Sequence, residues 1–468
     1  MASTVIGDIG GRIRLRTALT GVDVLDPNID PRLLTFDSAW TSALRLLHSN
    51  VVSAAALGTA NISYGYSGSI PGGMQTGTRA VRVLSYPGAH GPYHPTLAWM
   101  RNGAGTLSYI PAGGSLSGPS PLGYQRGYGV CAVNLRDNEI YFSPSRDGVD
   151  YVYFIFATNP TAAEAGGPED GLIGFHDLYG TGLYLPRPGL NVMTASLDDM
   201  TLTTRRNHFQ IYESGTAYTT PGPVGSPGVA DGDFIGDDPF PTAISTLRRC
   251  KIVNLRGYYP HYPPVIAAHA DMGATWSRFS PSVFWLNPSQ ILVAGMNERS
   301  VGIRYAVVAS DPAYQYGVGP IVTRIHMDED VLLITKHGID MDAVSSDADY
   351  IFSSRRQSPR FTGFDQIPAG ASSGTYWLPS AGVAPAGAGP PFTFMMASDG
   401  LSNSGWWCGM GHVIMQDIAN SNPVLYGNYY GPYFAGCVIS RDQYKWYQNA
   451  GYPTLPIGYV STMNISDY

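Results

Sequence analysis

A four-residue pattern that occurs three times, at long intervals, constrains the fold of this chain more than any other feature. It consists of glycine, an aliphatic residue, aspartate or asparagine, and a second aliphatic residue, at Gly21–Val24, Gly189–Val192 and Gly338–Met341. A leucine precedes each glycine by six residues, at Leu15, Leu183 and Leu332, and an aspartate follows it by nine, at Asp30, Asp198 and Asp347. Such internal repetition predicts tandem copies of one structural unit.

Two further landmarks recur in the same order along the chain. A proline-led apolar stretch begins at Pro95, Pro264 and Pro391, and a strand-like run follows it at 151–160, at 303–312 and, more weakly, at 459–463. The spacing between copies far exceeds the 20–50 residues of solenoid and propeller repeats, so each copy is long enough to own a core. We predict three domains: 1–160, 161–313 and 314–468, named below the first, second and third segments.

Strand signals dominate all three segments and predict an all-β chain of three tandem, mutually similar, β-sandwich-like domains with long Gly/Pro-rich loops. The stretches 183–185, 191–194 and 200–203 predict a small meander with two tight turns. Gly21, Gly189 and Gly338 would supply a positive φ at the first turn, and the repeated aspartate would cap the second. Ser38–His48 is the one stretch that suggests helix, of three turns. Long loops are expected at 102–127, 216–241 and 369–391.

The composition excludes several classes of protein. Charged residues make up only 13% of the 468 residues, against about 25% in ordinary soluble domains. Hydrophobic residues at 44% exclude general disorder, and a net charge of −7 argues against a nucleic-acid-binding surface. No apolar run is long enough to cross a membrane, and the first residues do not resemble a secretory signal, which predicts assembly in a cytoplasm. The four cysteines are widely spaced, which favours free thiols.

Motifs that carry chemistry are few. Gly370–Gly374 has the letters of a nucleophile elbow but lies in an Ala/Ser/Gly run without the strand and helix that an elbow needs. Histidines at 90, 94, 261 and 269 lack nearby partner ligands, so we expect turns there and no metal site. Four carboxylates could hold a surface calcium ion, although a solvated acidic loop is the simpler interpretation: Asp231, Asp233, Asp237 and Asp238. We expect no enzyme activity and no cofactor.

An aromatic-rich stretch distinguishes the third segment. It contains Trp406, Trp407, Tyr429 and Tyr430. Aromatic faces of this kind stack on sugars or anchor protein interfaces, whereas packing inside a Tyr-rich chain is the simpler alternative. These four residues are therefore candidates for an interface or a glycan contact.

The segment 182–195, with sequence GLYLPRPGLNVMTA, resembles a small module found in virion proteins of tailed bacteriophages. That module has an aliphatic strand, Arg/Lys-Pro-Gly, an Asp/Asn-Val pair and a second strand ending in Ser or Thr. The family's later proline-led strand resembles 95–100 and 264–268. The first segment departs from the pattern at Ala18–Thr20 and the third at Thr335–His337.

The resemblance implies a structural subunit of the virion, in a tail tip, fibre or surface appendage. Its partners would be other virion proteins, copies of itself and a host-surface receptor or glycan, with no nucleic acid and no membrane insertion. Three copies in one chain would also imitate a trimer at a three-fold position. Two alternatives stay open: a capsid decoration protein, and a carbohydrate-binding protein or polysaccharide depolymerase.

Overall fold

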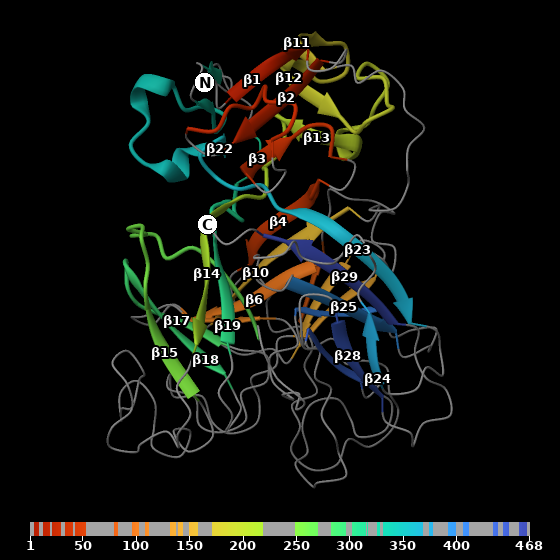
Figure 1. Cartoon of the computed structure of the whole chain (residues 1–468), viewed down its shortest axis with the longest axis vertical. Helices are drawn as coiled ribbons and strands as arrows, with labels where there is room; N and C mark the ends of the chain where they lie inside the picture. The colour runs from red at the N-terminus through yellow and green to blue at the C-terminus, as the bar shows by residue number, and fades with distance from the viewer. Residues whose placement is uncertain are drawn as a thin grey trace, which may run out of the picture.

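A computed structural model of the chain describes most of the predicted strands and their turns. The described residues are 4–8, 13–18, 21–29, 33–40, 43–52, 79–82, 96–102, 108–111, 132–136, 139–143, 149–157, 171–218, 249–269, 282–295, 302–314, 316, 325–327, 331–367, 374–377, 392–398, 406–410, 434–438, 443–448 and 458–465. The fold is all-β, as the sequence predicts, and every strand pair in the described part of the chain is antiparallel. Three small sheets gather at one end of the molecule and the larger sheets at the other (Figure 1).

The small sheets form what we name the head, and each comes from one segment. Each has three strands in chain order. The first segment contributes β1 (Thr4–Asp8), β2 (Ile13–Ala18) and β3 (Leu34–Asp37). The second contributes β11 (Leu172–His176), β12 (Gly180–Pro186) and β13 (Met200–Thr203). The third contributes β20 (Ile325–Met327), β21 (Leu332–Thr335) and β22 (Tyr350–Ser353).

The repeated glycine shapes the turn after the middle strand of each small sheet. The φ angles of Gly21, Gly189 and Gly338 are 86°, 87° and 86°, in the left-handed region that glycine favours, as the sequence predicts. Two residues later, the side chains of Asp23, Asn191 and Asp340 each accept a hydrogen bond from the amide two residues further on, at 3.0, 2.8 and 3.4 Å. The four-residue pattern is therefore a turn device, with glycine reversing the chain and the Asx side chain closing the next bend.

The predicted meander is wrong in its middle strand. Residues 191–194 form a turn, because the Asn191 side chain bends the chain there, and β12 pairs directly with β13. A short 3₁₀ helix precedes the last strand of the small sheets in the second and third segments: η2 (Leu197–Asp199) and η4 (Asp347–Asp349), with η3 (Met341–Ala343) earlier in the third.

One hydrophobic core holds the three small sheets together. Leu15, Leu183 and Leu332 are completely buried in it, one from each segment. Around them lie Phe36, Leu185, Leu202, Ile334, Ile351 and Phe352. A three-stranded sheet has too little surface to bury its own face, so each sheet depends on the other two. Each of the three central leucines makes the same pair of hydrogen bonds, to the hydroxyl and backbone N–H of a partner: Ser38, Thr204 and Ser354.

The larger sheets form what we name the body. In each segment the first and the proline-led body strands both flank the last one. These triplets are β4 (Leu46–Val52), β10 (Val149–Phe156) and β6 (Thr96–Asn102); β14 (Ile211–Tyr218), β19 (Gly302–Val308) and β16 (Val265–His269); and β23 (Arg360–Ile367), β29 (Gly458–Asn464) and β25 (Phe392–Ser398). The common order arises because long connections bring the segment's last strand back beside its first.

Two triplets grow into seven-stranded sheets by taking strands from another segment. The first segment's sheet continues through β7 (Ser108–Pro111) into β17 (Ser282–Asn287), β18 (Gln290–Gly295) and β15 (Arg249–Asn254) of the second. The third segment's sheet continues through β26 (Trp406–Met410) into β8 (Ala132–Arg136), β9 (Glu139–Ser143) and β5 (Arg79–Arg82) of the first. A further three-stranded sheet contains β24 (Gly374–Trp377), β28 (Gln443–Gln448) and β27 (Phe434–Val438).

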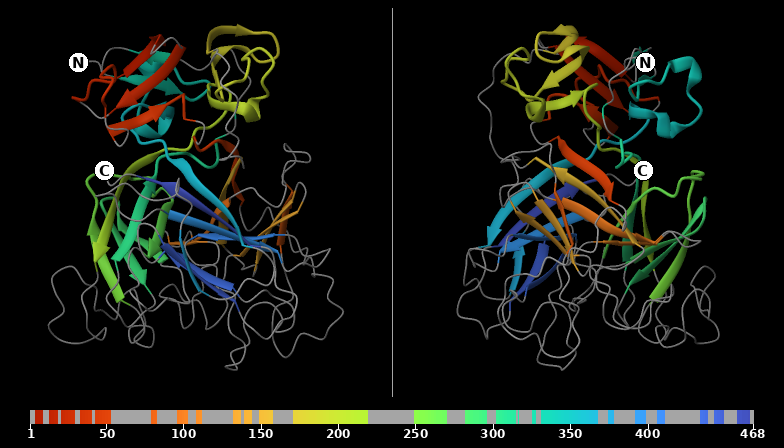
Figure 2. Two further views of the ribbon diagram at one scale, coloured as in Figure 1. Left: turned by 45° about the vertical axis from the view of Figure 1, so that its right-hand side comes forward. Right: turned by 180° about the vertical axis from the view of Figure 1, so that it is seen from behind.

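The body core also draws on all three segments. It includes Trp99 and Phe154 of the first, Trp285 of the second, and Phe392 and Met463 of the third. The Trp99 indole donates a hydrogen bond to the Val265 carbonyl at 3.2 Å, which ties the first segment to the second. The two largest cores of the described residues are thus shared by the three segments, whereas two smaller hydrophobic clusters each lie within a single segment. The two views of Figure 2 show the colours of the three segments interleaved within the body.

Two further expectations differ from the structure. Ser38–His48 does not form a helix in its described residues: Ser38 and Ala39 make a turn, and β4 begins at Leu46. Pairing with β10 and burial of Leu44 and Leu46 in the body core override the local preference. Two of the predicted long loops contain strands, β7 and β24, and most of the remaining residues of those loops lie outside the described part.

Candidate functional site

The best-defined polar cluster lies where the chain passes from head to body. This neck, made of residues 38–40, 43–45, 204–210 and 354–359, connects the last strand of each small sheet to the first body strand of the same segment. Hydroxyl, amide and arginine side chains are frequent here, beside the buried Leu44 and Phe209, because the chain leaves one sheet and must satisfy its backbone groups before it enters the next.

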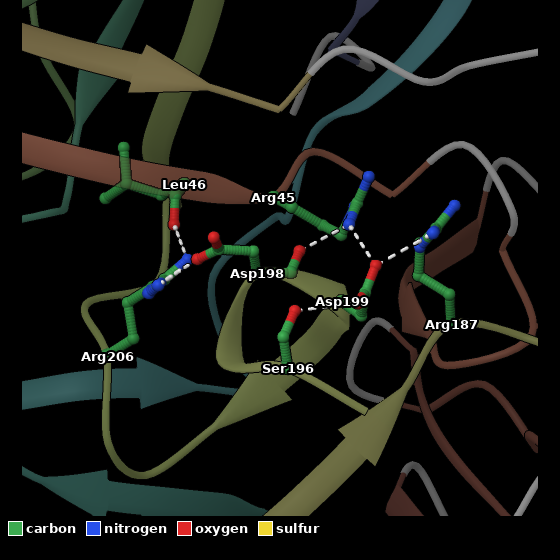
Figure 3. Close-up of polar contacts among 7 residues, drawn as sticks. All are labelled: Arg45, Leu46, Arg187, Ser196, Asp198, Asp199 and Arg206. Carbon is green, nitrogen blue, oxygen red and sulfur yellow. Dashed lines mark hydrogen bonds and ion pairs between the residues drawn. The ribbon is translucent and has the colours of Figure 1, made fainter. Parts of the chain in front are cut away.

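The contact between the first and second segments is built from three arginines and two aspartates (Figure 3). The buried Arg45 of the first segment donates to the backbone carbonyl of Asp198 in the second. Arg206 of the second segment pairs with the Asp198 carboxylate beside it and donates across to the Leu46 carbonyl of the first at 3.4 Å. Next to Asp198 in the second segment, Arg187 pairs with the Asp199 carboxylate at 2.8 Å, and the Ser196 hydroxyl donates to the same carboxylate at 2.7 Å.

The charges at this contact set the state of Asp199. Partial burial acts to raise the pKa of the Asp199 carboxyl, but the hydrogen bonds from Ser196 and Arg187 and the charges of Arg187 and Arg45 outweigh it. The pKa of Asp199 therefore lies below its ordinary value, and the carboxylate is charged at neutral pH.

The second and third segments meet around one buried amide. The Gln210 side chain accepts from the Ser353 amide at 2.8 Å and donates to the Ser353 carbonyl at 3.0 Å and the Ser358 hydroxyl at 3.2 Å. The backbone of Ile211 adds an antiparallel bridge to Gln357. A primary amide serves this junction well, because it presents both donors and an acceptor from one side chain.

The third and first segments close the ring of contacts. The Thr35 hydroxyl donates to the Ser354 carbonyl at 2.9 Å, and the Leu44 amide donates to the Pro359 carbonyl at 3.2 Å. Each segment is thus hydrogen-bonded to both others at the neck.

A neutral histidine lies in the middle of the neck. His208 is buried, its ring lies 3.0 Å from the Ser358 hydroxyl, and it packs edge-on against Phe36 and at a tilt against Phe352. These contacts come from all three segments. Burial lowers the pKa of His208 to about 3, since no charge in its surroundings offsets the cost of desolvating an imidazolium.

A buried carboxylate in the body has only internal partners among the described residues. Glu213 of β14 accepts from the amides of Arg256 and Gly257 at 3.0 and 2.9 Å and from the Tyr259 hydroxyl at 2.8 Å. Burial first, and the adjacent Glu213 charge second, raise the pKa of Tyr259. This arrangement holds the chain after β15 against β14.

Two of the repeated aspartates, Asp198 and Asp347, contact arginines, whereas the sequence predicted that they would cap the second turn. Asp198 pairs with Arg206, and the Asp347 carboxylate lies 3.9 Å from Arg356, whose guanidinium donates to the Asp347 backbone carbonyl. The capping role in the third segment belongs to Asp349, which accepts from the amides of Ser345 and Ser346 at 2.8 and 3.0 Å. The stretch between the repeated glycine and the last strand is one residue longer in the third segment than in the second, so the aspartates that align in the sequence do not occupy equivalent positions. Asp30 lies outside the described residues.

The other candidates from the sequence are not gathered into a site by the described residues. Trp406 and Trp407 stand on β26 opposite Leu135 and Asn134 of β8, in the middle of a seven-stranded sheet. His261 is exposed after β15 and His269 ends β16. Outside the described residues lie Tyr429, Tyr430, His90, His94, residues 370–373, and the four calcium candidates Asp231, Asp233, Asp237 and Asp238.

The described residues contain neither a candidate metal site nor a membrane-spanning helix. No group of three or more His, Cys, Asp and Glu side chains there could hold a metal ion. No helix in that part of the chain has the length and hydropathy required to cross a membrane.

Sequence reasoning missed the residues that matter most at the neck, Arg45, Gln210 and His208. The available signal was the pair of arginines after two hydroxyl residues, at 203–206 and 353–356. No family model, curated protein or solved structure matches this chain.

Proposed function

We propose that this chain is a structural subunit of a tailed-bacteriophage particle, in a tail tip, fibre or surface appendage, and that it works by packing against other proteins. The proposal starts from the resemblance of residues 182–195 to a module of phage virion proteins. In the structure these residues form the middle strand of a small sheet and the glycine turn that follows it.

The observation that carries the proposal is the single core shared by three small sheets. Leu15, Leu183 and Leu332 meet in that core, and the three segments then share body sheets and contact one another all round the neck. Such an arrangement has the contacts of a trimer within one chain. A covalent trimer suits a rigid position in an assembly, since its stability does not depend on protomer concentration.

The described polar residues fit this role. Arg45, Arg206 and Gln210 of the neck each hydrogen-bond to a backbone group of another segment and so hold one segment to another. The side chains that would be expensive to bury alone are thus used for internal assembly.

The test is the location of the chain in purified particles of the phage whose genome encodes it. We expect the chain to remain with particles through a density gradient and a salt wash, and antibodies against the head to label the tail in electron micrographs. A chain found only in the soluble fraction of the lysate would overturn the proposal. Labelling of the capsid would replace the tail position by that of a decoration protein.

A further inference from the structure

The outer strand of the second small sheet has two large apolar side chains in solvent. Ile173 and Phe175 of β11 are 60% and 66% exposed, and Leu178 in the following turn is 71% exposed. β11 lies at the end of the head farthest from the body (Figure 1, Figure 2). Exposed apolar residues that cluster on one strand mark an interaction surface more often than isolated ones do.

The large apolar side chains on the matching strands of the other two small sheets are less exposed, although all three residues of β20 are exposed and Ile325 is 38% exposed. Ile6, Ile173 and Met327 stand opposite Leu15, Leu183 and Leu332 in the strand registers. Ile6 packs against the shared core, and Met327 is 41% exposed on a strand of only three residues. The second sheet therefore leaves the longest and most exposed apolar edge of the three.

β11 lacks the charged and proline residues that usually protect an edge strand, although Gly174 at its centre has a positive φ of 153°. It pairs with β12 on one side, and its position in the sheet order leaves the other side open in the described structure. Its sequence, LIGFH, contains no lysine, proline or acidic residue. Natural edge strands normally carry such residues to prevent pairing with another chain.

The chain already joins its own segments by pairing strand edges. β7 of the first segment pairs with β17 of the second, and β26 of the third with β8 of the first, antiparallel in both cases. Antiparallel edge pairing between separate segments is thus an established interface within this molecule, and β11 offers the same kind of edge to another molecule.

The sequence of β11 is complementary to itself. In an antiparallel pair centred on Gly174, Ile173 stands opposite Phe175 of the partner subunit, and the reverse pair follows from the two-fold axis. Aromatic and β-branched residues in such cross-strand pairs stabilise a sheet, and only glycine stands opposite glycine at the centre. A contact of this type uses the same patch on both molecules, as two-fold dimers do.

We propose that two copies of this chain associate through β11, joining their second small sheets into one six-stranded sheet across a two-fold axis. The occupant of the exposed edge is the β11 edge of a second copy. This contact does not depend on where the chain sits in a particle, so it and the proposed function can fail separately.

The first test is sedimentation of the purified full chain at increasing concentration. We expect a monomer–dimer equilibrium, with Phe175→Lys raising the dissociation constant at least about tenfold by removing both cross-strand pairs and placing two charges at the axis. The matched control is Leu178→Lys, which removes a similar exposed side chain outside the strand and should leave the dissociation constant within about twofold. Since both positions are exposed, both variants should fold, which circular dichroism will show.

The second test fixes the register. A mixture of chains carrying Ile173→Cys and chains carrying Phe175→Cys should form a disulfide-linked dimer faster than either variant alone, because the two positions face each other. Deuterium exchange at residues 172–176 should slow as concentration rises. A monomer at every concentration, equal weakening by the two lysine variants, or cross-linking without preference for the mixture would each overturn the proposal.

Discussion

The head and the body join the same three segments in different ways. In the head, each segment supplies a complete three-stranded sheet, and the sheets share a core through their faces. In the body, a sheet begun by one segment is continued by strands of another through backbone pairing at their edges. Face packing brings matching residues of the three segments into one core, whereas edge pairing joins a segment to a particular neighbour.

This difference explains where the repetition is visible in the sequence. In the head every segment has the same leucine, glycine turn and hydroxyl partner, and the three leucines meet in one core. Body strands need only apolar faces and complementary edges, so their residues vary between segments while the order of first, last and proline-led strands is the same.

The largest expected effect tests whether the three head sheets are interchangeable. Replacing Leu15, Leu183 or Leu332 by alanine removes a fully buried side chain from one core, and each change should lower the free energy of unfolding by about 2–5 kcal/mol. Urea denaturation, with deuterium exchange read separately on head and body strands, will measure it. Leu178→Ala, in the exposed turn after β11, is the control and should change stability by less than about 0.5 kcal/mol. A near-zero value for any one leucine would show that its sheet stands outside the common core.

The second effect is a pH dependence at the neck, where head and body meet. His208 is neutral in the folded chain because burial lowers its pKa to about 3, whereas the unfolded value is near 6.5. The contribution of the neutral His208 to the free energy of unfolding is therefore fully present above about pH 6.5. It decreases as pH falls toward 3, and at pH 5 the loss is about 2 kcal/mol.

The variant that tests this assignment is His208→Gln, whose side chain does not titrate. Its free energy of unfolding should not show the decrease between pH 7 and pH 5 that His208 causes. Asp199 and Asp349 do not obscure it. Their pKa values are lowered, so their contributions are present above the ordinary carboxyl range and are lost only as pH falls further. An equal loss of stability in His208→Gln over this interval would refute the assignment to His208.

The sequence predicted individual turns and strands, but it did not predict which segments share a core. The positive φ of Gly21, Gly189 and Gly338 and the strand at 151–156 follow from local patterns, and the structure confirms them. The sharing of both cores and the contacts of Arg45 and Gln210 depend on which segments meet in space, which spacing along the chain does not encode. Ser38–His48 shows the same limit, since its helical pattern gave way to pairing with a strand more than a hundred residues away.

The third expected effect is smaller and sharpens the repeated contact in the head. In Thr204→Val the Leu183 amide loses its hydroxyl partner at 3.2 Å while the buried shape is kept, which should cost about 1–2 kcal/mol. Ser38→Ala and Ser354→Ala remove the same bond in the other segments and should cost similar amounts. Thr201→Val is the matched control: this buried threonine has no hydrogen-bond partner for its hydroxyl in the described structure, so its loss should be neutral or stabilising. A cost at Thr201 equal to that at Thr204 would mean that the hydroxyl contact is not the cause.

The smallest effect separates two arginine contacts that look alike in the sequence. Arg206 pairs with the Asp198 carboxylate, which is 41% exposed, whereas Arg356 donates to the Asp347 backbone carbonyl and the Asp347 carboxylate is 76% exposed and 3.9 Å away. Asp198→Asn should therefore lower the free energy of unfolding by up to about 1 kcal/mol, with the loss shrinking at high salt because solvent and ions screen an exposed pair. Asp347→Asn should have no measurable effect, since the backbone carbonyl that binds Arg356 is unchanged. Urea denaturation at low and high salt distinguishes the two, and a double-mutant cycle with Arg206→Gln isolates the pair itself. Equal losses of stability at the two positions would show that both arginines act through their charge alone. The difference between the Arg206 and Arg356 hydrogen bonds would then have no effect on stability.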